Sequence, residues 1–191
     1  MYTEYEATFY PVDKDETRAI LNKVGAKLIR PEFMQKRVNF YPPKEKRNTP
    51  SWLRVRDEGD KVTMSFKANT IAEGIDGQKE ICLVVDDYNR AIDFLDTILE
   101  RKAYQETKRE LWELDGVEIS IDTWPWLESF VEVEGKNEAE VKRVSEKLGF
   151  DYSKALFCAV GDIYCKKYNI SYQDMNNKIK IATFELDNPF K

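Results

Sequence analysis

The chain has 191 residues, 42% of them hydrophobic and 13% aromatic, which suits one globular domain and leaves no room for a second independent core. Its formal charge of −5 argues against a surface that coats nucleic acid, and no apolar run approaches the roughly 18 residues that a membrane span needs. The start of the sequence has neither a basic segment nor an apolar segment typical of a signal peptide, so we expect a cytoplasmic protein.

The first segment, residues 3–9 (TEYEATF), alternates like a β-strand. Glu4 and Glu6 then share one face, and the apolar residues Ala7 and Phe9 lie on the other. A helix is predicted near 14–24, because acidic residues stand at its start and a glycine at its end. Residues 33–41 are predicted as a strand, and the basic, proline-containing stretch 42–50 as a loop.

The middle of the chain predicts hairpins. Two alternating runs surround the turn sequence DEGD at 57–60, a loop covers 69–78, and a strand follows at 79–86. The apolar stripe within 87–104 predicts a helix, and an Asp-Gly turn within 107–124 predicts a second hairpin. Residues 129–135 are the last predicted strand, helices follow at 137–149 and within 151–168, and residues 171–191 stay unplaced.

About eight strands in hairpins with a few helices predict an α+β fold, in which an antiparallel sheet curls or closes into an eight-stranded barrel. Strand after strand places charged residues on the face opposite the aliphatic ones. If that face lay outside, the charges would be simply solvated. Amphipathic helices need apolar strand faces to cover, which favours charges inside. These residues are Glu4, Glu6, Arg37, Arg54, Arg56, Lys67, Glu80, Glu118, Asp122, Glu132 and Glu134.

Both signs of charge occur in this set, with carboxylates on the first and last strands and Arg or Lys on the middle ones. The chain has no histidine, so an oxygen-ligated ion such as Mg²⁺ or Mn²⁺ is the metal to expect. This polarity predicts a polyphosphate held through metal ions on one side and guanidinium groups on the other. Trp124 and Trp126 are compatible with packing or with stacking on a base.

Short motifs in a fixed order resemble the CYTH domain, also called the triphosphate tunnel metalloenzyme family. They are EYEATF (4–9), WLRVRDEG (52–59), SFKA (65–68), KEI (79–81), TKRELW (107–112), SIDTW (120–124) and SFVEVEG (129–135). The resemblance spans residues 1–150 and extends to about 168, so we expect a tunnel domain at 1–170 followed by a tail at 171–191. The family includes class IV adenylyl cyclases, thiamine triphosphatases and inorganic triphosphatases.

The resemblance implies a role for each matching residue. Glu4, Glu6, Asp122, Glu132 and Glu134 match metal-binding positions, and Arg54, Arg56, Lys67 and Arg109 match phosphate-binding positions, while Arg37 and Glu80 are added as substrate contacts. Glu4, Glu6, Arg54, Arg56, Lys67 and Arg109 would thus carry catalysis. Thr8 stands where the family's ExExK motif has its lysine, so one cation is missing.

The function that the sequence predicts is metal-dependent hydrolysis of tripolyphosphate, ATP or thiamine triphosphate. An adenylyl cyclase that forms cyclic AMP is the alternative, and a non-catalytic binder of triphosphate or polyphosphate is a second one, which Thr8 keeps open. We expect neither nucleic acid nor a membrane as partner, and the sequence leaves open whether the chain forms a homodimer.

Overall fold

The computed structural model describes residues 1–47, 50–69 and 74–191. The predicted loops at 42–50 and 69–78 therefore fall partly outside the described residues. Within the first of them, a short 3₁₀ turn, η1 (Lys44–Lys46), follows two prolines.

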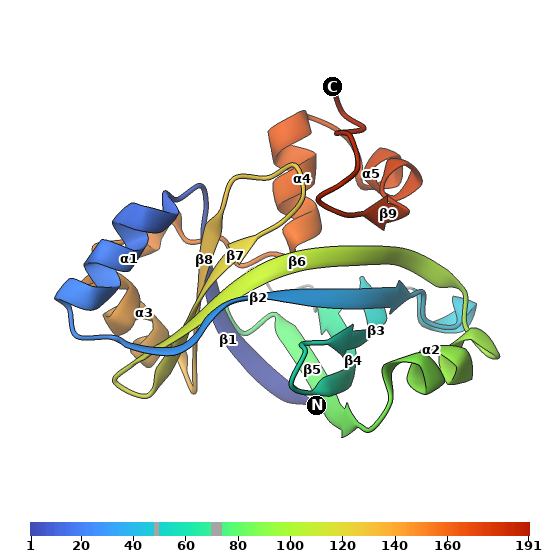
Figure 1. Cartoon of the computed structure of the whole chain (residues 1–191), viewed down its shortest axis with the longest axis horizontal. Coiled ribbons are helices and arrows are strands. Elements are labelled where there is room, and N and C mark those ends of the chain that lie inside the picture. The colour runs from blue at the N-terminus through green and yellow to red at the C-terminus, as the bar shows by residue number, and fades with distance from the viewer. Residues whose placement is uncertain (48–49, 70–73) are drawn as a thin grey trace.

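Eight strands form a closed antiparallel barrel, as the sequence predicts (Figure 1). The order around it is β2-β3-β4-β5-β1-β8-β7-β6, and pairing of β6 with β2 closes the ring. A ninth, two-residue strand adds to β6 in parallel. The strands are β1 (Tyr2–Phe9), β2 (Lys27–Phe40), β3 (Ser51–Asp57), β4 (Val62–Asn69), β5 (Gln78–Val85), β6 (Arg101–Leu114), β7 (Val117–Thr123), β8 (Phe130–Gly135) and β9 (Ile181–Ala182).

The helices lie outside the barrel and cover the apolar strand faces (Figure 1). In one core, Leu21 and Val144 meet Ala7 and Phe9 of β1. In a second, Ile92 packs on the β2–β3 pair, and a third joins the two C-terminal helices to the β7–β8 connection. The helices are α1 (Lys14–Lys23), α2 (Tyr88–Asp96), α3 (Glu138–Lys147), α4 (Val160–Tyr168) and α5 (Tyr172–Lys178), and η2 (Tyr152–Lys154) is a 3₁₀ turn.

Local sequence signals fix the ends of these helices. The Asp13 carboxylate accepts from the N–H groups of Asp15 and Glu16 at 2.9 Å each, which caps α1. Asn137 caps α3 in the same way, and Gly149, at φ +86°, ends it in a conformation that glycine adopts without strain. Alternation along the strands then places aliphatic residues under the helices and charged residues inside.

Two predicted helices are wrong in part. The helix predicted over 87–104 ends at Asp96, and the chain enters β6 at Arg101. Long-range pairing of β6 with β2 outweighs the helical pattern of residues 101–104. The helix predicted over 151–168 begins only at Val160, because Leu156 forms two backbone hydrogen bonds with Thr8, at 2.9 and 3.0 Å, and is extended there.

Strand β2 begins at Lys27, well before the predicted position 33. Its pairing with β6 shifts register on both sides of Arg30, next to Pro31. Proline has no N–H to donate to a ladder, and sequence patterns that contain it are therefore read as non-strand. The missing N–H of Pro31 accounts for the irregular pairing in the first half of β2.

Residues 171–191, which the sequence leaves unplaced, contain α5 and β9. Both lie on the barrel near β6 (Figure 1), since Tyr104 and Gln105 of β6 pair with Ile181 and Ala182. No helix among the described residues has the length and apolarity needed to cross a membrane.

Candidate functional site

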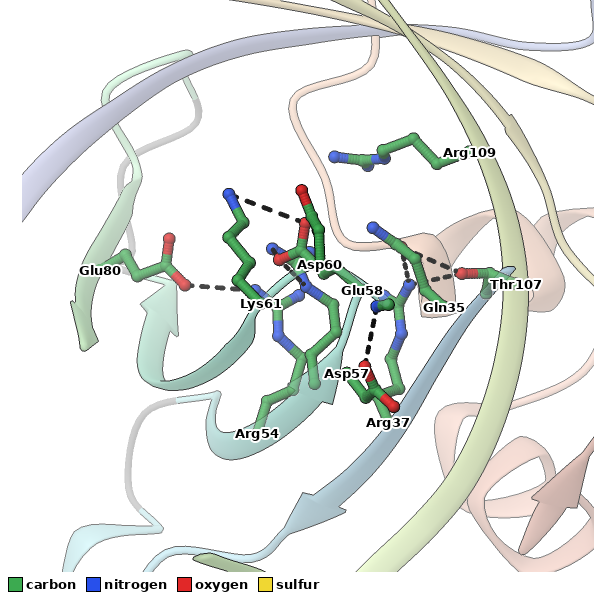
Figure 2. A network of polar contacts seen from close by, with 12 residues as sticks. Gln35, Arg37, Arg54, Asp57, Glu58, Asp60, Lys61, Glu80, Thr107 and Arg109 are labelled. Carbon is green, nitrogen blue, oxygen red and sulfur yellow. Dashed lines mark hydrogen bonds and ion pairs between the residues drawn. The ribbon is translucent and has the colours of Figure 1, made fainter. Parts of the chain in front are cut away.

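A cavity of about 620 Å³ occupies the inside of the barrel. Every sequence-predicted site residue except Asp122 lines it: Glu4, Glu6, Arg37, Arg54, Arg56, Lys67, Glu80, Arg109, Glu132 and Glu134. Figure 2 shows Arg37, Arg54 and Arg109 extending from β2, β3 and β6 toward this shared interior. A volume of this size is typical of small-molecule sites.

The strand register explains why these side chains meet. Residues directly opposite in antiparallel strands share a face, and here the opposed pairs include Glu6 with Glu134 and Lys67 with Glu80. Arg37 likewise stands opposite Arg56. The register therefore puts like charges side by side at Glu6–Glu134 and Arg37–Arg56, and opposite charges at Lys67–Glu80. The two like-charged pairs are costly unless an ion of opposite charge lies between them.

Arg37 is the least compensated cation of the site. Its guanidinium donates to Gln35 Oε1 at 2.6 Å and Thr107 Oγ1 at 2.5 Å (Figure 2), and lies 4.8 Å from the Trp124 ring centre. Only 4% of Arg37 is exposed, and none of the described carboxylates forms an ion pair with it. Burial, together with the charge of neighbouring arginines such as Arg54, lowers its pKa well below the usual value.

Arg54 and Arg56 of β3 lie beside Arg37, and we call these three residues the basic wall. Arg54 is buried and reaches Glu80 at 3.3 Å, while its Nε atom has no partner among the described residues. Burial and the charge of Arg56 lower the pKa of Arg54 to about 10. Arg56 forms an ion pair of 2.7 Å with Glu58. Nearby carboxylates therefore do not fully neutralise the positive charge of the basic wall at Arg37 and Arg54.

Lys67 pairs with carboxylates of two neighbouring strands. Its ammonium group lies 2.9 Å from Glu4 of β1 and 3.8 Å from Glu80 of β5. Burial raises the pKa of Glu4 to about 7 despite this contact. For Glu80 burial acts in the same direction, but its hydrogen bond with Glu4 and the charges of Lys67 and Arg54 outweigh it and lower the pKa to about 2.

Arg109 is fully paired, in contrast to Arg37. It binds Asp122 through two hydrogen bonds of 2.8 and 2.9 Å and Glu132 through one of 2.5 Å. Asp122 is fully buried and also accepts from Ser120 at 2.7 Å. Both oxygens of Asp122 thus already accept hydrogen bonds from protein groups. The metal-binding role that the sequence predicts for Asp122 stays a prediction.

Four carboxyl side chains form the opposite side of the cavity, which we call the acidic wall: Glu4, Glu6, Glu132 and Glu134. Burial raises the pKa of Glu6 to about 7, and burial next to Glu6 and Asp122 raises the pKa of Glu132 well above its usual value. The Oε2 atom of Glu4 is buried and accepts no hydrogen bond from a donor among the described residues. A large fraction of Glu4 and Glu6 side chains is therefore protonated near neutral pH, and a bound cation would displace these protons.

The donor chemistry fits a hard divalent cation, because the available ligands are carboxylate oxygens and one of them, Glu4 Oε2, accepts no hydrogen bond from a described donor. Glu4, Glu6, Glu132 and Glu134 are the residues that would hold it. The described residues contain no group of three or more acidic or cysteine side chains already spaced to bind a metal ion. Side-chain rotation would have to bring these carboxylates together.

Sequence reasoning missed part of the cavity wall. Asn39 of β2, Tyr41 just after β2 and Trp52 of β3 line it, and the alternation that places Arg37 and Arg54 inside could have revealed them. The C-terminal helices and the residues that flank them add lining residues without such a signal: Cys158, Asp162, Tyr164, Tyr172, Met175, Asn176 and Ile179.

Solved structures with similar folds come from diverse organisms. A hypothetical protein from Pyrococcus furiosus is 20% identical, with a TM-score of 0.69 over 82% of this chain and 97% of its own. A putative adenylate cyclase from Vibrio parahaemolyticus is 10% identical, with a TM-score of 0.71 over 85% and 98%. A putative adenylyl cyclase from Hippeastrum, described as having a dominant triphosphatase activity, is 12% identical, with a TM-score of 0.57 over 90% and 97%.

At these identities the similarity establishes the fold alone. No curated protein sequence matches the chain. The model of the CYTH domain matches residues 3–163, which is most of the sequence. The motifs quoted above, the closed barrel and this match agree, and the chain belongs to the CYTH domain family.

Proposed function

We propose that the protein hydrolyses a triphosphate substrate inside the barrel with the help of Mg²⁺ or Mn²⁺. The observation that carries this proposal is Arg37, a buried guanidinium with no carboxylate partner among the described residues, beside the partly compensated Arg54. Buried cations of this kind are costly in an empty site and favourable once a multivalent anion binds. A chain of phosphates supplies such an anion, and guanidinium groups match its oxygens in geometry.

In this proposal the basic residues bind the phosphate groups and the acidic residues bind the metal ion. Arg37, Arg54, Arg56 and Lys67 would contact the phosphate oxygens, and Glu80 would orient Arg54 and Lys67 through its ion pairs. Arg109 would contact phosphate from the opposite side while Asp122 holds its guanidinium in place. Because phosphoryl transfer needs little covalent chemistry from the protein, positioning and charge neutralisation are the main contributions of these residues.

The acidic wall would hold the metal ion through Glu4, Glu6, Glu132 and Glu134. A divalent ion bound there supplies charge neutralisation at the phosphate oxygens and lowers the pKa of water. Binding requires these carboxyls to lose the protons that burial favours near neutral pH. We therefore expect metal affinity to increase with pH.

An adenylyl cyclase is the alternative function. Aromatic side chains of Trp52 and Trp124 line the same cavity and offer surfaces on which a base could stack. The Vibrio and Hippeastrum neighbours are both described as putative cyclases, and the second also as a triphosphatase. The second alternative, a non-catalytic binder, follows from Thr8, since the family motif has a lysine at this position.

One assay separates the three functions. Metal-free protein is mixed with tripolyphosphate, ATP or thiamine triphosphate, and phosphate and cyclic AMP are measured with and without Mg²⁺ or Mn²⁺. Metal-dependent phosphate release from at least one substrate is the expected result, and it should be lost in Arg54→Ala. Arg143→Ala, which removes an exposed ion pair with Asp115, is the matched control.

Cyclic AMP as the main product would indicate that the protein is an adenylyl cyclase and not a triphosphatase. Binding without turnover of any of the three substrates would favour the non-catalytic function. Absence of both binding and turnover would contradict the proposal.

A further inference from the structure

One mouth of the cavity carries cations that the triphosphate site does not use. Around the Tyr41 ring, the Arg47 guanidinium carbon lies 4.8 Å from the ring centre, and the Nζ atoms of Lys102 and Lys180 lie 5.9 Å from it. Tyr41 and Lys102 also line the cavity. We call these four residues the basic mouth.

The basic mouth has an excess of positive charge. Arg47 is paired with Glu100 at 3.2 Å, but none of the described carboxylates lies within ion-pair distance of Lys102 or Lys180. Lys102 is half-buried, and its burial together with the charge of Lys180 lowers its pKa. A half-buried ammonium group at Lys102 next to the exposed ammonium group of Lys180 forms a site that favours an anion.

The position of the basic mouth relates it to the proposed triphosphate site. Arg37, Asn39 and Tyr41 occupy successive inward positions at the end of β2, and all three line the cavity. Tyr41 is four residues beyond Arg37, roughly 13 Å at about 3.3 Å per residue. The basic mouth therefore continues the row of cations outward along the same cavity, and α5 provides the wall beside it through Met175 and Asn176.

We propose that the basic mouth binds a further phosphate of a linear chain that extends beyond the triphosphate, so that the preferred ligand is inorganic polyphosphate of four or more phosphates. The inference rests on the proposed function, which places the first phosphates at Arg37 and Arg54. Lysine ammonium groups bind phosphate as point charges. The ring of Tyr41 already has three cations around it, which leaves little room for a base to stack there.

Calorimetry of the full chain tests this inference. Metal-free protein in EDTA, which prevents metal-dependent turnover, is titrated with tripolyphosphate, linear tetraphosphate and adenosine tetraphosphate. We expect tetraphosphate to bind about tenfold more tightly than tripolyphosphate, the scale of one added charged hydrogen bond. Lys102→Ala combined with Lys180→Ala should remove this preference and leave the affinity for tripolyphosphate nearly unchanged.

Two single variants serve as controls. Lys142→Ala removes a lysine with a similar ring contact, 5.7 Å from the Tyr152 ring on the α3 side, and should keep the preference. Lys102→Arg retains the charge and should also keep it. Thermal unfolding of each variant establishes that it is folded.

Equal affinity of the unmodified protein for the two inorganic chains would overturn the inference, as would equal weakening of both in the double lysine variant. Tighter binding of adenosine tetraphosphate than of inorganic tetraphosphate would overturn the choice of an inorganic chain. Lysine-dependent binding of tetraphosphate without measurable binding of tripolyphosphate would contradict the proposed function and leave the basic mouth supported.

Discussion

Replacing Arg37 by methionine should stabilise the ligand-free protein and weaken triphosphate binding at the same time. The guanidinium is 4% exposed, has no ion pair with a described carboxylate and lies near Arg54 and Arg56. Methionine keeps much of the aliphatic volume and removes the charge. Gln35 and Thr107 remain partners of each other through their own hydrogen bond of 3.2 Å.

The expected change in the free energy of unfolding is the difference between opposing contributions. Removing a buried, uncompensated ion relieves a penalty of several kcal/mol. Two hydrogen bonds and the contact with Trp124 are lost, at about 1 kcal/mol each. We expect a net gain of about 1–2 kcal/mol, which raises Tm by roughly 2–8 °C for a chain of this length. Loss of a charged contact to phosphate should raise Kd about 10–100-fold.

The assay combines denaturant unfolding of the ligand-free variant with calorimetric titration of tripolyphosphate. Arg109→Met is the contrasting control, because this guanidinium is paired with Asp122 and Glu132. Its removal leaves buried carboxylates without a partner and should destabilise the protein by about 3–5 kcal/mol. An Arg37→Met protein that is less stable and binds tripolyphosphate as well as the parent would refute the reasoning.

Further predictions concern the other residues of the two walls. Arg54→Ala should weaken tripolyphosphate binding by roughly 1.5–3 kcal/mol in calorimetry, and an unchanged Kd would mean that Arg54 does not contact the ligand. Glu4→Gln combined with Glu6→Gln should abolish metal-dependent phosphate release while the fold stays intact or gains stability; full activity would remove both residues from the site. Burial raises both pKa values from 4.5 to about 7, so the folded state holds more protons in this window. The free energy of unfolding of metal-free protein should therefore fall as pH rises from about 4.5 to 7, and this slope should become smaller in the double variant, where the raised pKa of Glu132 still contributes.

Strand periodicity predicted most of the charged strand residues that face the cavity, although Asp122 does not line it. Glu4 and Glu6 on one strand and Arg54 and Arg56 on another alternate with aliphatic residues, and the pleat fixes their common face. Whether that face lies inside or outside was decided by the amphipathic helices, because each needs an apolar strand face to cover. The barrel has this arrangement, with Ala7 and Phe9 under α1 and α3.

The contacts among the charged residues could not be predicted in the same way. The pairing of Arg109 with Asp122, and the absence of such a partner at Arg37, depend on strand register and side-chain rotation. The wall from α4 and α5 was missed because the extended segment at Leu156, which carries the chain to these helices, is set by its contact with Thr8 across the fold. Local sequence contains no signal for such a long-range contact.

A crystal structure with tripolyphosphate and Mn²⁺ tests the central claim most directly. We predict anomalous density for manganese at Glu4, Glu6, Glu132 and Glu134, and phosphate oxygens within hydrogen-bond distance of Arg37 and Arg54. Phosphates bound outside the barrel, or manganese away from these four carboxylates, would contradict the account.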